Sequence, residues 1–456
     1  AKPAEQTPLI AHFAVSLMHD AGVPRSALQL LPGAGDVGAA LTSDPRIDGV
    51  AFTGSTATAL RIRAAMAENL APGTPLIAET GGLNAMIVDS TALPEQAVTA
   101  VIESAFQSAG QRCSALRCLY VQEDIAESFL EMLTGAMDEL TLGNPWDLNT
   151  DSGPVIDAAA QAGILEHIAK ARADGRVIKE MATPDGGTFV APTLIRVSGI
   201  SDLEREIFGP VLHLATFRSG DLDRIIDDIN ATGYGLTFGL QTRIDDRVQH
   251  VSDRIHAGNV YINRNQIGAI VGSQPFGGEG LSGTGPKAGG PNYLPRFGAP
   301  DVQNGDGAWT TDMDIGALTI PTPTNRAIET LTLPGPTGES NRLSTSARAP
   351  LLCMGPGDAV AEKQAAAINA LGGIAVKATG RLAPQALTFL YGISGVLWWG
   401  DDTTARAIEQ ALAKRDGPII PLITGLPDLA RVRAERHVCV DTTAAGGNTA
   451  LLGGAA

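Results

Sequence analysis

The chain has 456 residues, of which 44% are hydrophobic, 18% charged and only 4% aromatic, with 53 glycines and 28 prolines. This composition predicts a globular protein of two or three domains with many tight turns, and it excludes long helical or fibrous architectures. The net charge of −16 is spread along the chain, which excludes a nucleic-acid partner through charge repulsion, and no apolar run reaches the roughly 20 residues that span a bilayer.

Strand-like runs alternate with amphipathic helical stretches from the start of the chain. Predicted helices begin near Val37, Ser55 and Pro94, between the runs LQLLP, GVAFTG, PLIAET and AMIVD. This alternation predicts an α/β fold with parallel strands and crossover helices. The pattern continues to about residue 263 through CLYVQ, a helix from Ile125 to Leu140, GILEHIAKARADG, FGPVLHLATF, YGLTFGLQT and GNVYINR.

Two glycine-rich or irregular stretches follow. Residues 272–290 are too rich in glycine for regular structure and predict a functional or connecting loop. Residues 298–342 predict an extended linker or flap.

A second run of strands and helices then begins at APLLCMG and continues through GIAVKA, GVLWWG, PIIPLIT and HVCVD. It predicts a small doubly wound α/β domain. Asp401 and Asp402 stand where a helix N-terminus would otherwise meet an anion, so we interpret them as helix caps and this domain as cofactor-free. The residues after Asp441 are small and uncharged, which predicts a frayed or docked tail.

Two stretches near the N-terminus could hold a phosphate. PGAGDVGAAL contains Gly33-x-Gly35-x-x-Gly38, but no acidic residue follows about 20 positions later, so a tight turn is the competing interpretation. GVAFTGSTATAL places Ser55 at the start of a helix after a buried strand, where it could bind an anion or act as an ordinary N-cap.

Glu79 and Cys113 are the candidate reactive groups. Glu79 ends an apolar strand and meets Gly81-Gly82, a flexible pair that can bring the backbone close to a ligand. Cys113 is the one cysteine in a polar setting, beside Arg112 and a predicted helix end at Gly110, a combination that can lower a thiol pKa, and it is the candidate nucleophile. The other three cysteines lie in apolar runs and none forms a Cys-x-x-Cys pair, which is typical of a cytoplasmic protein without disulfides or a metal site.

No histidine has a recognisable cysteine-protease setting, so Glu79 is the candidate base that activates water.

Taken together, FTGST, ETGG, GQRCSA and REIFGPV resemble the aldehyde dehydrogenase superfamily. The match runs from Lys2 to about Phe297. The ending GAIVGSQPFGGEGLSGTGPKAGGPNYLPRF is similar to the glutamate semialdehyde (pyrroline-5-carboxylate) dehydrogenases, and LPGPTGESN, the second module and the tail DTTAAGGNTALL resemble the C-terminal part of long bacterial proline utilisation A proteins.

The resemblance implies NAD as the cofactor. Lys2 and Glu5 would bind the adenosine ribose hydroxyls, Ser55 the pyrophosphate, and Glu206 with Phe208 the nicotinamide end. A carboxylate at the ribose favours NAD over a 2′-phosphate. The remaining implied cofactor-binding positions are Gly33 and Gly81.

The resemblance also implies the reaction. Cys113 would attack the aldehyde and Glu79 would activate water to hydrolyse the thioester, yielding glutamate. The substrate carboxylate would be bound by Ser114 and the backbone of Gly268 and Ala269, with Phe276 against the aliphatic part; the alternative for Gly268 and Ala269 is a strand-to-loop corner.

The resemblance implies the following division of the chain: 1–81 as a partial Rossmann-like NAD-binding domain, 82–281 as the catalytic domain, 282–298 returning to the NAD domain, 299–342 as linker or flap, 343–436 as a Rossmann-like domain, and 437–456 as a sealing tail. Chains of this family begin well before Lys2, with strands and an oxyanion-binding Asn, so we expect a fragment. In the long proteins an upstream FAD-dependent proline dehydrogenase would pass its product to Cys113, and we expect either contact with such a domain or a homo-oligomer.

Two alternatives stay open at this point: a dehydrogenase of the same superfamily for another aldehyde, and a truncated scaffold without catalysis.

Overall fold

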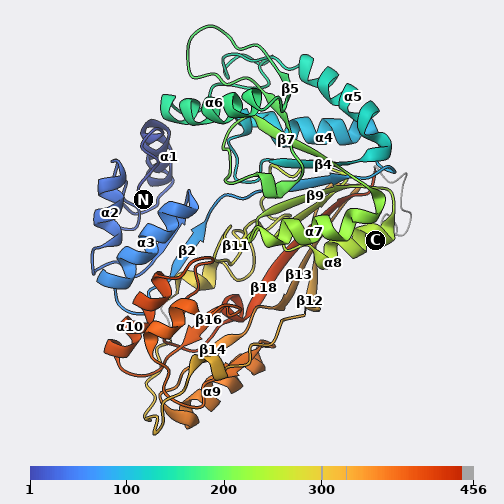
Figure 1. The fold of residues 1–456 in the computed structure, drawn as a ribbon. Coiled ribbons are helices and arrows are strands. Elements are labelled where there is room, and N and C mark those ends of the chain that lie inside the picture. Colours follow the sequence, from blue (N-terminus) through green and yellow to red (C-terminus); the bar gives the residue numbers. More distant parts are fainter. Residues whose placement is uncertain (299–300, 325, 444–456) are drawn as a thin grey trace.

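The computed structural model describes residues 1–298, 301–324 and 326–443. Figure 1 shows three parts: an N-terminal α/β segment, a central ten-stranded sheet with helices on both faces, and a smaller α/β module at the opposite end from β5. Among the described residues, no helix has the length and apolar character needed to cross a bilayer.

The N-terminal segment is built around two parallel strands. Val50 pairs with Leu76 and Thr53 with Glu79, so Glu79 stands at the carboxyl end of its strand. Ala59 and Met66 of the adjacent helix, and Leu70 directly after it, are buried against this pair. The elements are α1 (Pro8–Asp20), α2 (Gly35–Thr42), β1 (Val50–Thr53), α3 (Thr56–Asn69) and β2 (Leu76–Glu79).

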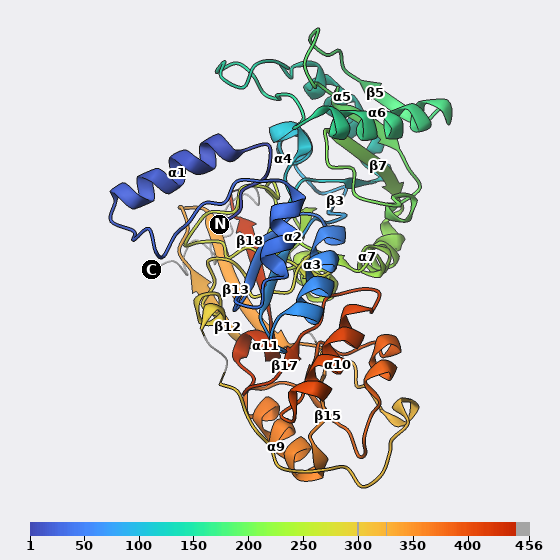
Figure 2. The ribbon, with the colours of Figure 1, turned by 90° about the vertical axis from the view of Figure 1, so that its left-hand side faces the viewer.

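The first 32 residues differ from the prediction. LQLLP is not a strand. The Leu31 amide donates a hydrogen bond to the Ala1 carbonyl and the amino terminus donates to the Gln29 carbonyl, but these two bonds do not form the hydrogen-bond ladder of a β-sheet. The helix α1 was not predicted, although its apolar residues Leu9, Phe13 and Leu17 repeat at helical spacing. This helix has no buried residue and projects from the molecule (Figure 2).

The central sheet has the order β12-β13-β18-β10-β9-β3-β4-β7-β6-β5. The pairings from β18 to β6 are parallel, and antiparallel strands flank them at both edges. All five residues of β4 are buried, as expected for a parallel sheet covered on both faces. Its strands, together with the two-residue strands of a small separate sheet, are β3 (Ala85–Val88), β4 (Cys118–Gln122), β5 (Val177–Glu180), β6 (Thr193–Arg196), β7 (Val211–Phe217), β8 (Tyr234–Gly235), β9 (Thr237–Gln241), β10 (Asn259–Ile262), β11 (Glu279–Gly280), β12 (Ala327–Leu333), β13 (Glu339–Ala347) and β18 (Arg433–Asp441).

Successive residues of the central strands face different cores. Ile87 packs with residues of α6, α7 and α8, whereas Met86 and Val88 pack with residues of α4 and α5. These helices are α4 (Pro94–Phe106), α5 (Ala126–Asp138), α6 (Ala158–Ala173), α7 (Leu222–Ala231) and α8 (Asp245–Arg254). The predicted crossover pattern is confirmed for this part of the chain.

Two expectations about the C-terminal third are wrong. HVCVD is not a strand of the second module, because β18 pairs in parallel with β10 and antiparallel with β13. The predicted flap of residues 299–342 contains β12 and the start of β13, which form a hairpin at the edge of the central sheet. His437 of β18 pairs with Asn259 of β10, which lies 178 positions earlier (437 less 259), and such a separation leaves no local signal. The predicted sealing tail lies outside the described residues from 444 onward.

The second module is a four-stranded parallel sheet of order β15-β14-β16-β17. The predicted doubly wound arrangement is confirmed, with the first strand in the middle. Asp401 caps a helix, as predicted, by accepting a hydrogen bond from the Thr404 amide at 2.8 Å. The elements are β14 (Leu351–Cys353), α9 (Gly357–Ala370), β15 (Ala375–Lys377), a 3-10 turn (Pro384–Phe389), β16 (Gly395–Leu397), α10 (Asp402–Ala413), β17 (Leu422–Ile423) and α11 (Leu429–Val432).

Helix α10 joins the second module to the N-terminal segment by polar contacts with α3. Arg63 of α3 and Glu409 of α10 form an ion pair of 2.7 Å with both side chains at most 5% exposed. Arg406 donates to the carbonyls of Ala67, Glu68 and Leu70, which cap the end of α3. The module is therefore anchored on a helix that begins beside the candidate phosphate site.

We expect Glu409→Ala to destabilise the chain by about 3 to 5 kcal/mol, because it leaves the Arg63 guanidinium buried without its counter-charge. Urea denaturation followed by fluorescence measures this change. Glu362→Ala is the matched control, since Glu362 pairs with Lys377 at 2.6 Å while 67% exposed. Equal stability of the two variants would contradict the expectation.

Candidate active site

Glu79 is enclosed by the predicted glycine-rich loop. Its Oε2 accepts a hydrogen bond of 3.2 Å from the amide of Gly278, and its Oε1 is buried without a hydrogen-bond partner. Burial raises the pKa of Glu79 to about 8, against the opposing effects of the Gly278 hydrogen bond and of the Lys287 charge. A buried carboxyl with a free oxygen is suited to exchange a proton near neutral pH.

The loop approaches Glu79 this closely because its residues are glycines. A Cβ added at Gly277 or at Gly283 would lie 3.2 Å from a carboxylate oxygen of Glu79, and one at Gly278 would lie 2.6 Å from Ser282 Cβ. Larger residues would push the loop off the carboxyl group. The prediction of a functional loop at 272–290 agrees with this arrangement.

Cys113 follows an unusual turn at the end of α4. Ser108, Ala109 and Gly110 have φ values of 55°, 53° and 65°, three successive residues in the left-handed region. Two non-glycine residues in this region imply stored backbone strain of about 1 kcal/mol or more each, which is found at functional sites. The helix predicted to end at Gly110 ends at Phe106.

Two buried side chains hold the Cys113 loop. Asn84 Nδ2 donates to the carbonyls of Cys113 at 2.7 Å and Ala115 at 2.9 Å. The Arg117 guanidinium, which is fully buried, donates to the carbonyls of Gly110 and Arg112. Both were missed by sequence reasoning, although a polar residue within each apolar run, GGLNAMIV and ALRCLY, was an available signal.

The structure contradicts the expected lowering of the Cys113 pKa. Burial raises the pKa of the Cys113 thiol, and the negative charges of Glu206 and Glu79 raise it further. The other three cysteines are buried, as predicted.

Glu206 lies between the Glu79 strand and the Cys113 loop. Arg117 Nη2 donates to Glu206 Oε1 at 2.9 Å, and the Arg117 guanidinium also lies over the Phe208 ring, 5.2 Å from its centroid. A Cβ at Gly81 would be 1.8 Å from Glu206 Oε2, so only glycine fits there. Three predicted segments that are distant in the sequence, those of Gly81, Cys113 and Glu206, therefore lie side by side in the candidate site.

The predicted adenosine-side residues gather around α2 and α3. Ser55 Oγ accepts a hydrogen bond of 3.2 Å from the Thr58 amide, which makes it the N-cap of α3. The side chain of Lys2 lies beside Gly38, where a Cβ would be 3.6 Å from Lys2 Cδ, and Glu5 is exposed. Gly33 faces Val37, whose Cγ2 would be 2.3 Å from an added Cβ.

The predicted substrate-binding positions occupy two segments. Ser114 is buried next to Cys113, and its carbonyl accepts from Thr237 and Gln266. Gly268 has a φ of 70° and is exposed beside Ala269, and Arg112 Nη1 would be 3.8 Å from a Cβ at Gly268. The backbone of Phe276 pairs with Ala288 within the glycine-rich loop. No group of three His, Cys, Asp or Glu residues able to hold a metal occurs in the described ranges.

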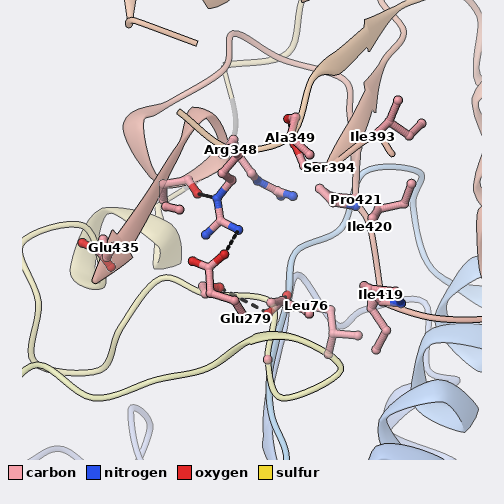
Figure 3. A pocket seen from close by; sticks show the side chains of 18 of the residues that line it. Leu76, Glu279, Arg348, Ala349, Ile393, Ser394, Ile419, Ile420, Pro421 and Glu435 are labelled. Carbon is pink, nitrogen blue, oxygen red and sulfur yellow. Dashed lines mark hydrogen bonds and ion pairs between the residues drawn. The ribbon is translucent and has the colours of Figure 1, made fainter. Parts of the chain in front are cut away.

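A separate cavity of about 290 Å³ lies between the glycine-rich loop and the second module. Figure 3 shows Arg348 reaching Glu279 across it, opposite apolar residues such as Ile393 and Pro421. Gly283 lines this cavity and also approaches the Glu79 carboxylate. The loop therefore separates the cavity from the candidate catalytic pair.

The family model described as "Aldehyde dehydrogenase family" matches residues 1–299. The Bifunctional protein PutA of Salmonella typhimurium is 43% identical, over 99% of this chain and 39% of that protein. A 1-pyrroline-5-carboxylate dehydrogenase of Bacillus cereus is 37% identical, over 64% of this chain and 58% of that enzyme. The chain thus spans about two fifths of the length of the bifunctional relative.

Solved structures agree with these matches. A proline utilization A (PutA) variant from Bradyrhizobium japonicum superposes with a TM-score of 0.64 at 55% identity, over 65% of this chain and 30% of that one. A 1-pyrroline-5-carboxylate dehydrogenase from Thermus with bound NAD superposes with a TM-score of 0.61 at 36% identity, over 65% of this chain and 58% of that one. Because the family model covers well over half of the 456 residues, the chain belongs to the aldehyde dehydrogenase family.

Proposed function

We propose that this chain oxidises L-glutamate 5-semialdehyde to L-glutamate with NAD. The observation that supports this reaction best is that the strained loop with the partly exposed Cys113 lies near Glu79, a buried carboxyl of raised pKa whose charge acts on the Cys113 thiol. The similarity to enzymes known as 1-pyrroline-5-carboxylate dehydrogenases indicates the substrate.

The Cys113 thiolate attacks the aldehyde carbon, forming the carbon–sulfur bond and an oxyanion to which the Cys113 amide would donate a hydrogen bond. NAD, when bound, accepts the hydrogen and two electrons that the substrate loses in this oxidation. The substrate is then held as a thioester on Cys113. Glu79 removes a proton from water, the resulting hydroxide attacks the thioester carbon, and the carbon–sulfur bond breaks to release the acid and the thiolate.

The residues present fit a dinucleotide. The N-terminus of α3, capped by Ser55, offers backbone amides to a pyrophosphate, while Lys2 and Glu5 would bind the adenosine ribose. Glu206 lies against Gly81, where only a glycine leaves room, and would position the nicotinamide end with Phe208. Gly33 shapes the turn that leads into α2.

For the substrate carboxylate, Ser114 and the backbone of Gly268 and Ala269 are the proposed partners, and Phe276 would pack on the aliphatic part. The nearby Arg112 guanidinium adds positive charge at Gly268. We also propose that this region acts with a proline dehydrogenase domain of a longer protein; the relative named Bifunctional protein PutA, of which this chain covers 39%, has length for a further domain.

The test compares NAD reduction with glutamate semialdehyde, succinate semialdehyde and betaine aldehyde. The proposal expects the highest kcat/KM for glutamate semialdehyde, and a preference for NAD over NADP. Faster turnover of another aldehyde would mean that this chain is a dehydrogenase of the same family with a different substrate. Absence of turnover with all three would favour a non-catalytic scaffold.

The two steps should depend on pH in the same direction. Both Cys113 and Glu79 act in their ionised forms, and burial raises the pKa of each. We therefore expect the steady rate to rise with pH through a midpoint of about 8 and to level off about one pH unit higher, where Glu79 is mostly ionised. Steady-state assays paired with single-turnover measurements separate the two groups, and a steady rate that does not change between about pH 6 and about pH 9 would contradict a titrating base.

A further inference from the structure

A lysine that the proposed mechanism does not use is buried behind Glu79. Lys287 is 2% exposed, and its Nζ donates to Asn259 Oδ1 at 2.8 Å and to the carbonyl of Gly277. Burial lowers the pKa of Lys287, and neighbouring carboxylates oppose this effect. A buried ammonium group requires compensation by nearby negative charge.

One peptide group connects this lysine with Glu79. The carbonyl of Gly277 accepts from Lys287 Nζ, and the N–H on the other side of the same peptide bond, that of Gly278, donates to Glu79 Oε2 at 3.2 Å. A cation at the oxygen polarises the peptide and strengthens the donor at its nitrogen. The ammonium and the carboxylate therefore stabilise each other through the intervening peptide.

Close packing keeps this peptide in place. A Cβ at Gly258 would be 2.2 Å from the Gly277 carbonyl oxygen and 2.6 Å from Lys287 Nζ. Asn259 of β10 accepts from the Gly277 amide at 3.3 Å and donates to the Pro275 carbonyl at 2.9 Å. The orientation of the Gly278 N–H is thus set by groups anchored on the central sheet.

The other charged groups near Lys287 are Glu279, Glu435, Arg436 and His437. Glu279 faces the neighbouring cavity, where Arg348 Nη1 approaches it at 3.5 Å (Figure 3). Glu435 accepts from the Asn292 side chain and from the backbone amide of Lys287. Glu279 and Glu435 therefore have hydrogen-bond or ion-pair partners of their own. Glu79 instead accepts its hydrogen bond from the Gly277–Gly278 peptide, whose carbonyl is bound by Lys287.

We propose that Lys287 is a positioning residue for Glu79: its ammonium holds and polarises the Gly277–Gly278 peptide and thereby stabilises the ionised carboxylate that acts as the base. The role of Glu79 as a base rests on the proposed function. The coupling between the two side chains does not, because both can be titrated without turnover.

The first measurement is the titration of Glu79 by infrared spectroscopy of its protonated carboxyl, with Glu79→Gln identifying the band. We expect Lys287→Met to raise the Glu79 midpoint by about one pH unit or more, since it removes the cation without changing the volume greatly. The control Lys377→Met, which removes a half-buried lysine of the second module paired with Glu362, should leave the midpoint unchanged. An unchanged midpoint in folded Lys287→Met would overturn the proposal.

The reciprocal measurement, the titration of Lys287 in Glu79→Gln, keeps the proposal testable even if Lys287→Met does not fold. Glu79→Gln is isosteric, and we expect it to lower the Lys287 midpoint by a similar amount, because the coupling acts equally in both directions. NMR of lysines labelled at Cε reports this midpoint, and Lys287 is recognised by titrating below the exposed lysines. If Lys287 titrates identically in both proteins, the proposal fails.

The two proposals fail separately. Loss of substrate turnover with intact coupling would reject the proposed reaction and keep the Lys287–Glu79 pair. Intact turnover with an uncoupled pair would reject the positioning role alone. In an active enzyme, Lys287→Met should move the rising limb of the steady rate to higher pH while KM for the aldehyde changes little.

Discussion

Cys113→Ala is expected to abolish NADH formation from glutamate semialdehyde. An alanine has no sulfur to bond to the aldehyde carbon, so neither the adduct nor the thioester forms. Removal of a nucleophile lowers kcat by about four to six orders of magnitude, which places the variant below detection in a standard assay. NADH absorbance measures the rate, and binding of NAD to the variant shows that the cofactor site is intact.

Cys353→Ala is the control for loss of a thiol. Cys353 is buried in the second module, on a strand of a separate sheet, so its removal should leave turnover nearly unchanged. Measurable turnover of glutamate semialdehyde by Cys113→Ala would remove Cys113 as the nucleophile. The same variant should also lose the thiol that alkylating agents reach most readily, since Cys113 alone among the four cysteines is not buried.

The second large effect concerns Glu79→Gln. The amide keeps the volume of the carboxyl group but cannot take a proton from water, so oxidation should proceed once and hydrolysis should stall. We expect a burst of one equivalent of NADH followed by a steady rate lowered by about two to four orders of magnitude. Stopped-flow absorbance resolves the burst, and mass spectrometry of the quenched protein should show the acyl group on Cys113.

Glu362→Gln provides the comparison, because this exposed carboxylate in the second module pairs with Lys377, away from the candidate site. It should show the wild-type steady rate. An unchanged steady rate in Glu79→Gln would mean that another group activates the water.

Elements with a strong local signal were predicted well. The strand ending at Glu79 and the helix that Ser55 caps are both as expected, because residue periodicity and capping depend on neighbours within a few positions. The alternation of strands and helices in the second module was recognisable from the sequence for the same reason. In contrast, β18 was placed in the wrong sheet, since its partner β10 lies far away in the sequence.

The site divides in the same way. The identities of Cys113, Glu79 and Glu206 were available from motifs, and the structure brings them together. The direction of the Cys113 pKa was wrong, because sequence reasoning counted the adjacent Arg112 and not the burial and the two carboxylates that folding supplies. The holding contacts of Asn84 and Arg117 likewise depend on which carbonyls the folded loop presents.

The sequence by itself determined the α/β class, the family resemblance, the capped helix and the two candidate reactive side chains. Only the tertiary structure decided the protonation tendencies of these groups and the pairing of Glu79 with Lys287 through one peptide. The physical reason is that helix caps and apolar periodicity are local properties of the chain. Desolvation and charge–charge interactions are set by segments that meet only when the chain folds.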